Sequence, residues 1–244
     1  LNAENLPSKL DPVNTGERKT TVKHSLAPPS ESGRFFMSGE VLQLFFESVP
    51  GQITTVAVIF ILLLLVMRTN KKTNDVSVLV KTAVLLAVTF VLNNVTLFRM
   101  PHGGSITAFS MFALFLVGYL FGPRQGILAG LAYGLMDLVL NPYVIHPVQL
   151  FMDYPLGFGA IGIGGLLRNS KNGMIKGYCI GVLGRYLVVV LSGIIFWGMY
   201  AAEGFNAVSW SFFYNMTYIL PEAIATVVIL SIPKIRNIFD RFKE

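Results

Sequence analysis

Long apolar segments follow one another along most of this chain, and they constrain its fold more than any other feature. A helix that crosses a bilayer needs roughly 20 mostly apolar residues. Hydrophobic residues make up 53% of the sequence and charged residues only 13%. The apolar segments cover residues 52–67, 76–98, 107–122, 125–141, 147–167, 174–200 and 209–232. The sequence therefore predicts an all-α membrane protein.

The remaining parts of the chain are polar and short. Residues 1–36 are rich in Pro, Ser, Thr and charge without a hydrophobic period, which predicts a disordered leader or a non-native extension. Met37 is then a candidate start. Residues 37–75 hold the first transmembrane helix and a linker, and residues 76–232 hold the other six helices. Residues 233–244 form a basic tail.

Positive charge between the segments predicts how the chain crosses the membrane, because Lys and Arg concentrate in cytoplasmic loops. The loops at 99–106, 142–146 and 201–208 contain one such residue in total, Arg99, and are predicted to be external. The net charge of +6 then reflects topology in the lipid bilayer, and no nucleic-acid partner is expected. The predicted cytoplasmic loops and tail carry Lys71, Lys72, Arg124, Arg168, Lys171, Lys176, Lys234, Arg236, Arg241 and Lys243.

Several kinds of site are not expected. The single cysteine, Cys179, excludes a disulfide framework and a cysteine-based metal site. The three histidines lack the HExxH spacing of a zinc site, and no GxxxxGK[ST] motif is present to hold nucleotide phosphates. We therefore expect no metal, no cofactor and no ATPase activity in this chain.

Small residues recur at helical spacing in two segments. Gly126, Gly130 and Gly134 form successive GxxxG steps, and Ala83 and Ala87 form an AxxxA step. Small side chains let membrane helices approach closely, so that van der Waals packing can hold them together. Packing within the chain is the expectation for these residues, and a protein partner is the alternative.

Charged residues inside the apolar segments indicate where a cavity lies. A charge at the bilayer centre costs about 2.5–3.5 kcal/mol on insertion scales, so it usually faces a cavity or a partner. Aromatic walls with a few polar groups are typical of a small-molecule pocket, and an acid beside Trp and Tyr suits a cationic aromatic ligand. Four candidates stand out, Asp137, Asp153, Arg185 and Glu222. At helical spacing they extend into three stripes, His146–Gln149–Asp153, Arg185–Val189–Gly193–Trp197 and Trp210–Tyr214–Tyr218–Glu222.

Four short stretches, in this order along the chain, resemble one known family. They read MPHGGS at 100–105, HPVQLFMDY at 146–154, RY at 185–186 followed by SGIIFW at 192–197, and WSFFYN at 210–215. Each is weak alone, but their order and spacing together are specific. From about Val76 onward, the chain resembles the thiamine-specific substrate-capture component (S component) of energy-coupling-factor vitamin transporters.

The resemblance implies a fold and a function. The fold is a six-helix S-component core with both ends cytoplasmic, preceded here by one extra N-terminal transmembrane helix. The function is that of a high-affinity thiamine-binding subunit of the cell membrane, without enzymatic activity. The implied partners are a coupling transmembrane subunit and two ATPase subunits. Ala83 and Ala87 match the face that docks on the coupling subunit in this family.

The resemblance also implies a binding site near the external face. Asp153 would accept hydrogen bonds from the aminopyrimidine of thiamine, and Trp197 would stack on the thiamine rings. The first external loop, residues 99–105, would form a lid over the site. The family commonly has a histidine at the position of Val189, so a pyrimidine precursor or another vitamin remains an alternative ligand. The other expected binding residues are Asn215, Tyr154, Tyr143, Trp210, Gly193, Arg185, Gln149 and His102, and the lid residues are Met100, Pro101, Gly103, Gly104 and Ser105.

Two other functions remain as alternatives. A solo proton-coupled carrier would use Asp137 and Glu222 as relay groups, although no inverted repeat of the usual kind is visible. An intramembrane enzyme would need Ser192 as nucleophile and His146 as base. No GxSxG motif supports that reading.

Overall fold

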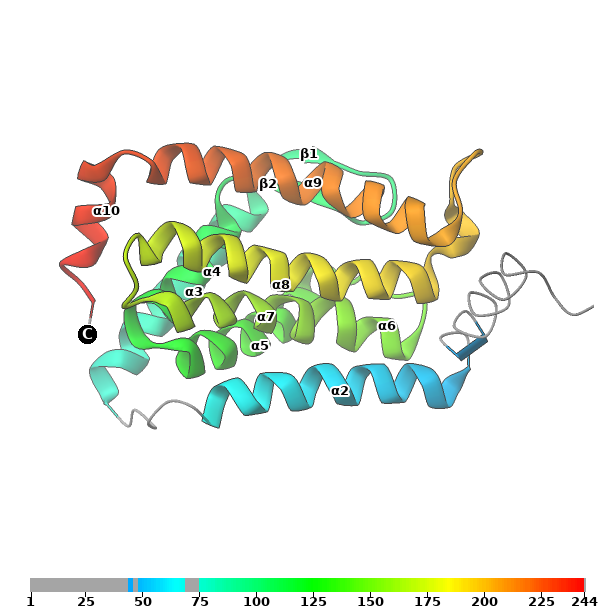
Figure 1. The fold of residues 1–244 in the computed structure, drawn as a ribbon, viewed down its shortest axis with the longest axis horizontal. Helices are drawn as coiled ribbons and strands as arrows, with labels where there is room; N and C mark the ends of the chain where they lie inside the picture. The colour runs from blue at the N-terminus through cyan, green and yellow to red at the C-terminus, as the bar shows by residue number, and fades with distance from the viewer. Residues whose placement is uncertain (1–43, 46–47, 69–74, 244) are drawn as a thin grey trace, which may run out of the picture. The chain divides into compact units, whose positions relative to one another are not determined.

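The computed structural model describes residues 44–45, 48–68 and 75–243, and these are mostly helical (Figure 1). The predicted leader at 1–36 and the linker at 69–74 lie outside the described residues. The α-helices are α2 (Val49–Arg68), α3 (Val76–Asn94), α4 (Ser110–Phe121), α5 (Pro123–Leu140), α6 (Pro147–Phe151), α7 (Gly157–Ile161), α8 (Gly173–Phe196), α9 (Ala207–Leu230) and α10 (Pro233–Asp240). A π-helix η1 (Met152–Leu156), 3-10 helices η2 (Gly162–Leu167) and η3 (Gly198–Tyr200), and strands β1 (Thr96–Arg99) and β2 (Ser105–Thr107) complete them.

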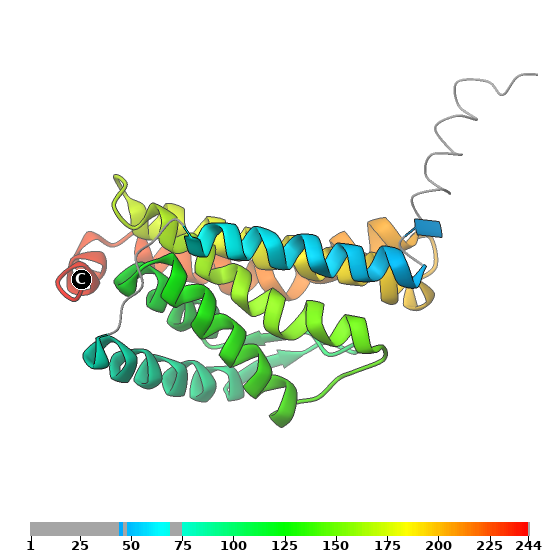
Figure 2. The same ribbon diagram turned by 90° about the horizontal axis from the view of Figure 1, so that it is seen from below.

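Five helical stretches are long and apolar enough to cross a membrane, which confirms the prediction of an all-α membrane protein. They are Val49–Arg68, Val76–Asn94, Pro147–Leu167, Gly173–Phe196 and Ala207–Leu230. α8 packs between α9 and the helical run of η1, α7 and η2, while α3 packs against α4. In Figure 2, α3 and α2 lie on opposite sides of the bundle.

A β-hairpin replaces the end of one predicted helix and the start of the next. The helix predicted over 76–98 ends at Asn94, and the one predicted over 107–122 begins at Ser110. Between them, Thr96 pairs with Thr107 and Arg99 with Ser105. The apolar character of 95–99 fits a strand as well as a helix, and the glycines at the tip favour a turn.

The helix predicted over 147–167 is present as a continuous helical run through α6, η1, α7 and η2. Its regularity breaks at η1, which contains Pro155. Proline has no backbone N–H and its ring clashes with the preceding turn, so a helix widens or kinks there. The π-turn carries Asp153 and Tyr154, two of the predicted binding residues.

The glycine row on α5 fits directly against this broken helix. A Cβ on Gly134 would lie 2.5 Å from the carbonyl oxygen of Tyr154, and a Cβ on Gly130 would lie 2.4 Å from that of Phe158. A Cβ on Gly126 would lie 2.5 Å from the Cα of Gly118. The expected packing of this row within the chain is confirmed.

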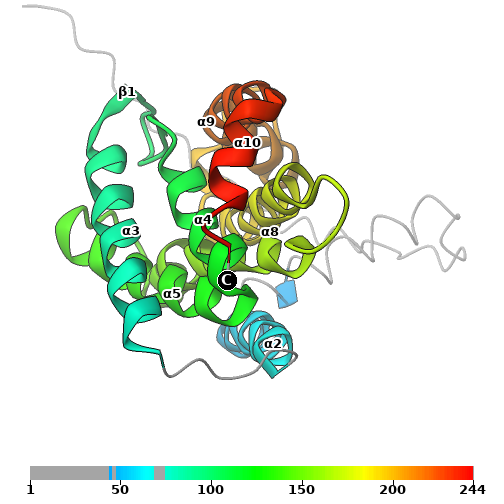
Figure 3. The same ribbon diagram turned by 90° about the vertical axis from the view of Figure 1, so that its left-hand side faces the viewer.

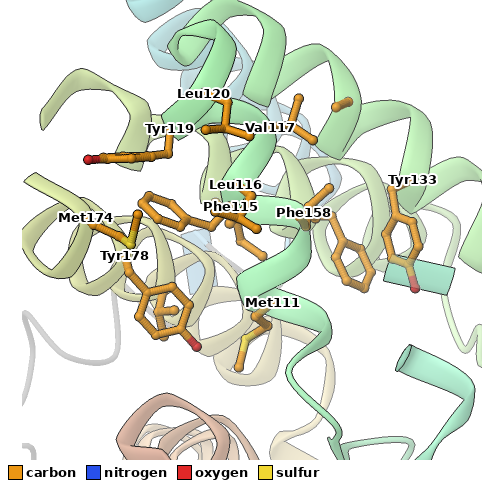
Figure 4. Close-up of a cluster of buried hydrophobic side chains, with 14 of the residues drawn as sticks. Met111, Phe115, Leu116, Val117, Tyr119, Leu120, Tyr133, Phe158, Met174 and Tyr178 are labelled. Carbon is orange, nitrogen blue, oxygen red and sulfur yellow. The ribbon is translucent and has the colours of Figure 1, made fainter. Parts of the chain in front are cut away.

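Aromatic side chains fill much of the core between α4, α5 and α8. Figure 4 shows Phe115 and Tyr178 beside Met174, with Tyr133 and Phe158 further along. The rings of Phe115 and Tyr178 meet edge to face with centroids 5.6 Å apart, a favourable aromatic arrangement. Met111 and Phe158 of this cluster also line the cavity described below, and Phe239 of the C-terminal helix packs against the cluster.

The predicted basic tail forms a helix, α10, that runs across the end of the bundle (Figure 3). Tyr119 on α4 donates a hydrogen bond to Asp240, and Arg236 donates to Asn172 at 3.2 Å. Phe239 packs edge to face on Phe112. These contacts hold the C-terminal helix against the bundle.

Candidate ligand-binding cavity

A cavity of about 440 Å³ lies at the end of the bundle opposite α10, and a volume of 300–1,000 Å³ is usual for small-molecule sites. All ten residues predicted to bind substrate line it, as do the five predicted lid residues. They come from the hairpin, the α5–α6 connection, α6, η1, α8 with the residue that follows it, and α9. The stripes that helical spacing predicted and the residues that the family resemblance implied therefore line the same cavity.

Gln149 and Asp153 form the acidic wall. The Gln149 amide donates a hydrogen bond to the Asp153 carboxylate at 2.5 Å and another to the Tyr143 carbonyl at 3.2 Å. Gln149 is buried, whereas Asp153 is partly exposed to the cavity. Gln149 therefore fixes the direction of a carboxylate that faces the cavity.

Aromatic rings form a second wall, which adjoins the acidic one through Tyr143. Tyr143 and Trp197 stack with centroids 5.5 Å apart and an interplanar angle of 15°. The His102 ring from the hairpin lies 5.1 Å from Tyr200 and 5.9 Å from Tyr214. Flat, electron-rich faces of this kind attract a cationic or aromatic ligand.

The hairpin tip closes over this wall. The Tyr214 hydroxyl accepts hydrogen bonds from the backbone N–H of His102 at 3.1 Å and of Gly104 at 3.4 Å. Gly103 has φ +90°, a conformation that L side chains rarely adopt, and a Cβ on it would lie 3.1 Å from the Tyr143 ring. The tip is therefore anchored to α9 by a side chain that itself lines the cavity.

Asn215 and Gly193 lie where α9 packs against α8, and there the Ser211 hydroxyl donates to the Val190 carbonyl at 2.7 Å. The Asn215 amide donates to the Ser211 carbonyl at 2.9 Å, and its oxygen accepts from the Tyr218 hydroxyl at 2.7 Å. A Cβ on Gly193 would lie 2.0 Å from the Ser211 hydroxyl oxygen, so no larger residue fits. Trp210 packs on Phe205 and Tyr214 at the rim.

Tyr154 ties η1 to the connection before α6. Its hydroxyl donates to the Asn141 carbonyl at 2.8 Å and accepts from the Tyr143 N–H at 2.7 Å. Val189, which stands where the family commonly has histidine, is buried in the lining and offers only its backbone carbonyl, to Asn215. The side chain at this position contributes no hydrogen bond.

Charged groups deeper in the cavity have protein partners or aromatic contacts. Asp137 accepts hydrogen bonds from the side chains of Asn93 and Asn141, both at 3.1 Å. Glu222 accepts from the Thr107 hydroxyl at 2.5 Å and from a backbone N–H of α4. The guanidinium of Arg185 lies 3.7 Å from the centre of the Phe158 ring.

Several lining residues were not predicted. Tyr200 and Asn93 lie near ends of helices, where composition alone does not distinguish a cavity from the membrane interface. Tyr214 was within a predicted stripe, but its hold on the hairpin depends on the fold. Among the described residues, no group of three or more His, Cys, Asp or Glu could hold a metal ion.

A second surface of interest lies on α3. Ala83 and Ala87 are both exposed, on a face that also exposes Val80 and Val84. Within the described residues this AxxxA step is therefore not used for packing inside the chain, unlike the glycine row on α5.

Comparisons with known proteins agree with this architecture. A family model described as "Thiamine transporter protein (Thia_YuaJ)" matches residues 79–239. Thiamine transporter ThiT of Bacillus subtilis is 32% identical over 168 residues, which are 62% of this chain and 87% of that protein. ThiT of Lacticaseibacillus paracasei is 27% identical over 177 residues, 64% of this chain and 85% of that protein.

A solved structure supports the fold. ThiT from Listeria monocytogenes superposes with a TM-score of 0.56 at 24% identity, covering 66% of this chain and 98% of that chain. The relatives are named as transporters, and none of these names is that of an enzyme. α2 precedes the residues that the family model matches.

Proposed function

Because this chain belongs to the thiamine transporter protein family, we propose that it is the high-affinity thiamine-binding subunit of an ATP-driven energy-coupling-factor importer. Family membership makes it a multi-pass membrane protein of thiamine uptake, and the finer assignment is our inference. The observation that carries it is the pairing of a cavity-facing carboxylate, Asp153, with the stacked rings of Tyr143 and Trp197.

The chemistry of thiamine suits this pairing. Its aminopyrimidine offers an amino donor to the carboxylate of Asp153, which Gln149 already orients. Its thiazolium ring carries a permanent positive charge, which the faces of Trp197 and Tyr143 attract through cation–π contact. Asn215, Tyr154, Trp210, Gly193, Arg185 and His102 complete the proposed binding site.

The hairpin tip would act as the lid. Residues 100–105 line the mouth of the cavity and are held by two hydrogen bonds to the Tyr214 hydroxyl and by ring contacts of His102. Because the tip is held by few contacts, it can open at a modest cost in free energy. Ligand entry would require release of these two hydrogen bonds, and closure would remake them over the bound vitamin.

Energy for uptake would come from partner subunits. The sequence has no GxxxxGK[ST] motif, so ATP would be hydrolysed by two ATPase subunits acting through a coupling membrane subunit. The exposed small residues Ala83 and Ala87 suit close docking of a helix from that subunit. By the positive-inside rule, α10 would be cytoplasmic and the cavity external.

The proton-coupled alternative has less support from the site. Asp137 and Glu222, its relay candidates, accept hydrogen bonds from side chains and from a helix terminus. Such contacts give both carboxylates a structural role.

Thiamine titration of the purified chain, followed by tryptophan fluorescence, tests the assignment. The only two tryptophans, Trp197 and Trp210, both line the cavity, so stacking should quench them in a saturable way. Absence of quenching by thiamine would remove the substrate assignment, and the pyrimidine precursor would be titrated next. Uptake in proteoliposomes with the coupling and ATPase subunits should require ATP. Uptake by the chain alone, abolished by a protonophore, would favour the solo carrier.

A further inference from the structure

α2 packs along the bundle through one narrow seam. Its residues at this seam repeat with helical spacing and face α5, α6 and η1. Leu63 is 2% exposed, although the outward residues Ile61 and Leu65 are more than half exposed. The seam consists of Val56, Ile59, Leu63, Val66 and Met67.

The seam meets the back of the π-turn that carries the proposed acid. Met152 and Leu156, the first and last residues of η1, are 0% and 4% exposed and belong to the same hydrophobic cluster as Leu63. Leu63 also lies beside Gly159, where a Cβ would be 3.6 Å from its terminal methyl carbon. Asp153 and Tyr154, between Met152 and Leu156, line the cavity instead. One short turn is thus held by α2 on one side and faces the cavity on the other.

A π-turn needs such support more than a regular helix does. π-helical turns are rare and occur mostly as single turns, frequently at functional sites. Pro155 supplies no N–H within this turn, which removes one backbone hydrogen bond. Side-chain packing therefore contributes more to fixing how the π-turn is rotated about the helix axis. That rotation sets the direction in which the Asp153 side chain points.

We propose that α2 is a positioning element for the cavity: its seam holds the π-turn at Met152–Leu156 so that Asp153 is pre-oriented toward the ligand. The proposal rests on the proposed function, and it extends that function to a helix outside the residues that the family model matches. Without the seam, only a fraction of molecules would present Asp153 correctly, and the apparent Kd rises as that fraction falls.

Leu63→Ala in the full chain tests this, with Leu65→Ala on the outward face as the matched control. We expect Leu63→Ala to raise the thiamine Kd about tenfold, the equivalent of about 1.4 kcal/mol, and Leu65→Ala to leave it unchanged. Leu63→Met, which conserves volume, should retain affinity. In the ligand-free protein, amide exchange of residues 152–156 should accelerate in Leu63→Ala and not in Leu65→Ala.

A double-mutant cycle separates positioning from general stability. If Leu63 acts through the turn, Leu63→Ala should weaken binding much less in a Met152→Ala background than in the wild type. A Leu63→Ala chain with a lower melting temperature but unchanged Kd and unchanged exchange at 152–156 would overturn the proposal, as would equal effects of Leu63→Ala and Leu65→Ala. If the wild type does not respond to thiamine, the proposed function fails, and the exchange measurement alone then decides whether α2 supports the turn.

Discussion

The carboxylate of Glu222 on α9 accepts a hydrogen bond at 2.8 Å from the backbone N–H of Met111, in the first turn of α4. The first N–H groups of a helix have no partner within it, and the positive end of the helix dipole favours an anion there. Phe109, at the N-cap of α4, has a left-handed backbone and no capping side chain. Glu222 therefore caps this helix from a distant segment.

Removal of this cap should destabilise the fold. In Glu222→Ala, the Met111 N–H and the Thr107 hydroxyl lose their buried acceptor, and hydrogen bonds to charged groups contribute about 1.5–3 kcal/mol. We expect a lower melting temperature in detergent, with partial recovery in Glu222→Gln, which keeps one acceptor oxygen. An unchanged melting temperature in Glu222→Ala would show that the cap is dispensable.

Asp153→Ala should abolish most thiamine binding while the chain folds normally. The ligand amino group would lose its charged acceptor, a loss of about 1.5–3 kcal/mol that corresponds to roughly a 10- to 100-fold rise in Kd. Asp153→Asn, which keeps an acceptor for Gln149, serves as the control for local geometry. Tryptophan quenching gives Kd and circular dichroism gives fold content. Unchanged affinity in Asp153→Ala would place the site elsewhere.

Tyr214→Phe should speed the release of bound ligand. The substitution keeps the ring at the cavity wall and removes the acceptor for the N–H groups of His102 and Gly104. A neutral hydrogen bond contributes about 0.5–1.5 kcal/mol, so we expect koff to rise roughly 2- to 10-fold in stopped-flow fluorescence. Tyr200→Phe, which removes a different hydroxyl at the mouth of the cavity, is the control and should leave koff unchanged. Equal release rates in wild type and Tyr214→Phe would mean that these bonds do not limit opening.

Ala83→Trp should leave thiamine binding intact and block ATP-dependent uptake with the partner subunits. The residue is exposed on α3 and lies away from the cavity lining, so a bulky ring there obstructs only a docked helix. Leu183→Trp, at an exposed position of α8, is the matched control and should transport normally. Intact uptake in Ala83→Trp would exclude this face as the docking surface.

Gly134→Ala should lower both stability and affinity. Its Cβ would lie 2.5 Å from the Tyr154 carbonyl oxygen, so α5 would have to move away from the π-turn. Overpacking of this kind costs typically about 1–3 kcal/mol. Thermal unfolding and thiamine titration measure the two effects, with Leu135→Ala on the exposed face as the control. If Gly134→Ala behaves like that control, the helices have room that the structure does not show.

The sequence predicted the site better than the element boundaries. Helical spacing placed Asp153 and Trp197 in polar and aromatic stripes, the family resemblance supplied their expected roles, and the structure keeps Asp153 in η1 and Trp197 directly after α8. The hairpin was missed because residues 95–99 are apolar, and apolarity does not distinguish a strand from the last turn of a helix. Its partner strand is brought close only by the turn at Gly103 and Gly104.

Other contacts depend on tertiary structure that no local pattern records. Glu222 was interpreted from its charge and from its place in a helical stripe, since its partner Met111 is far away in the sequence. α10 was read as a tail because its basic residues dominate its composition, although Ile235 and Phe239 recur at helical spacing and pack against the core. The proposed support of η1 by α2 could not be predicted from the sequence, because it depends on which face each helix turns toward the other.

The junction between α4 and α5 has a consequence for how the chain enters the bilayer during synthesis. α4 has 12 residues, a length of about 18 Å against a hydrocarbon core of about 30 Å, and α5 is not among the helices apolar enough to span alone. Gly122 ends one helix and begins the other, and Gly118 and Gly126 meet beside it. We expect the two to partition from the translocon as one helical hairpin, so that a bulky residue in the glycine row would impair biogenesis before it could affect the finished protein.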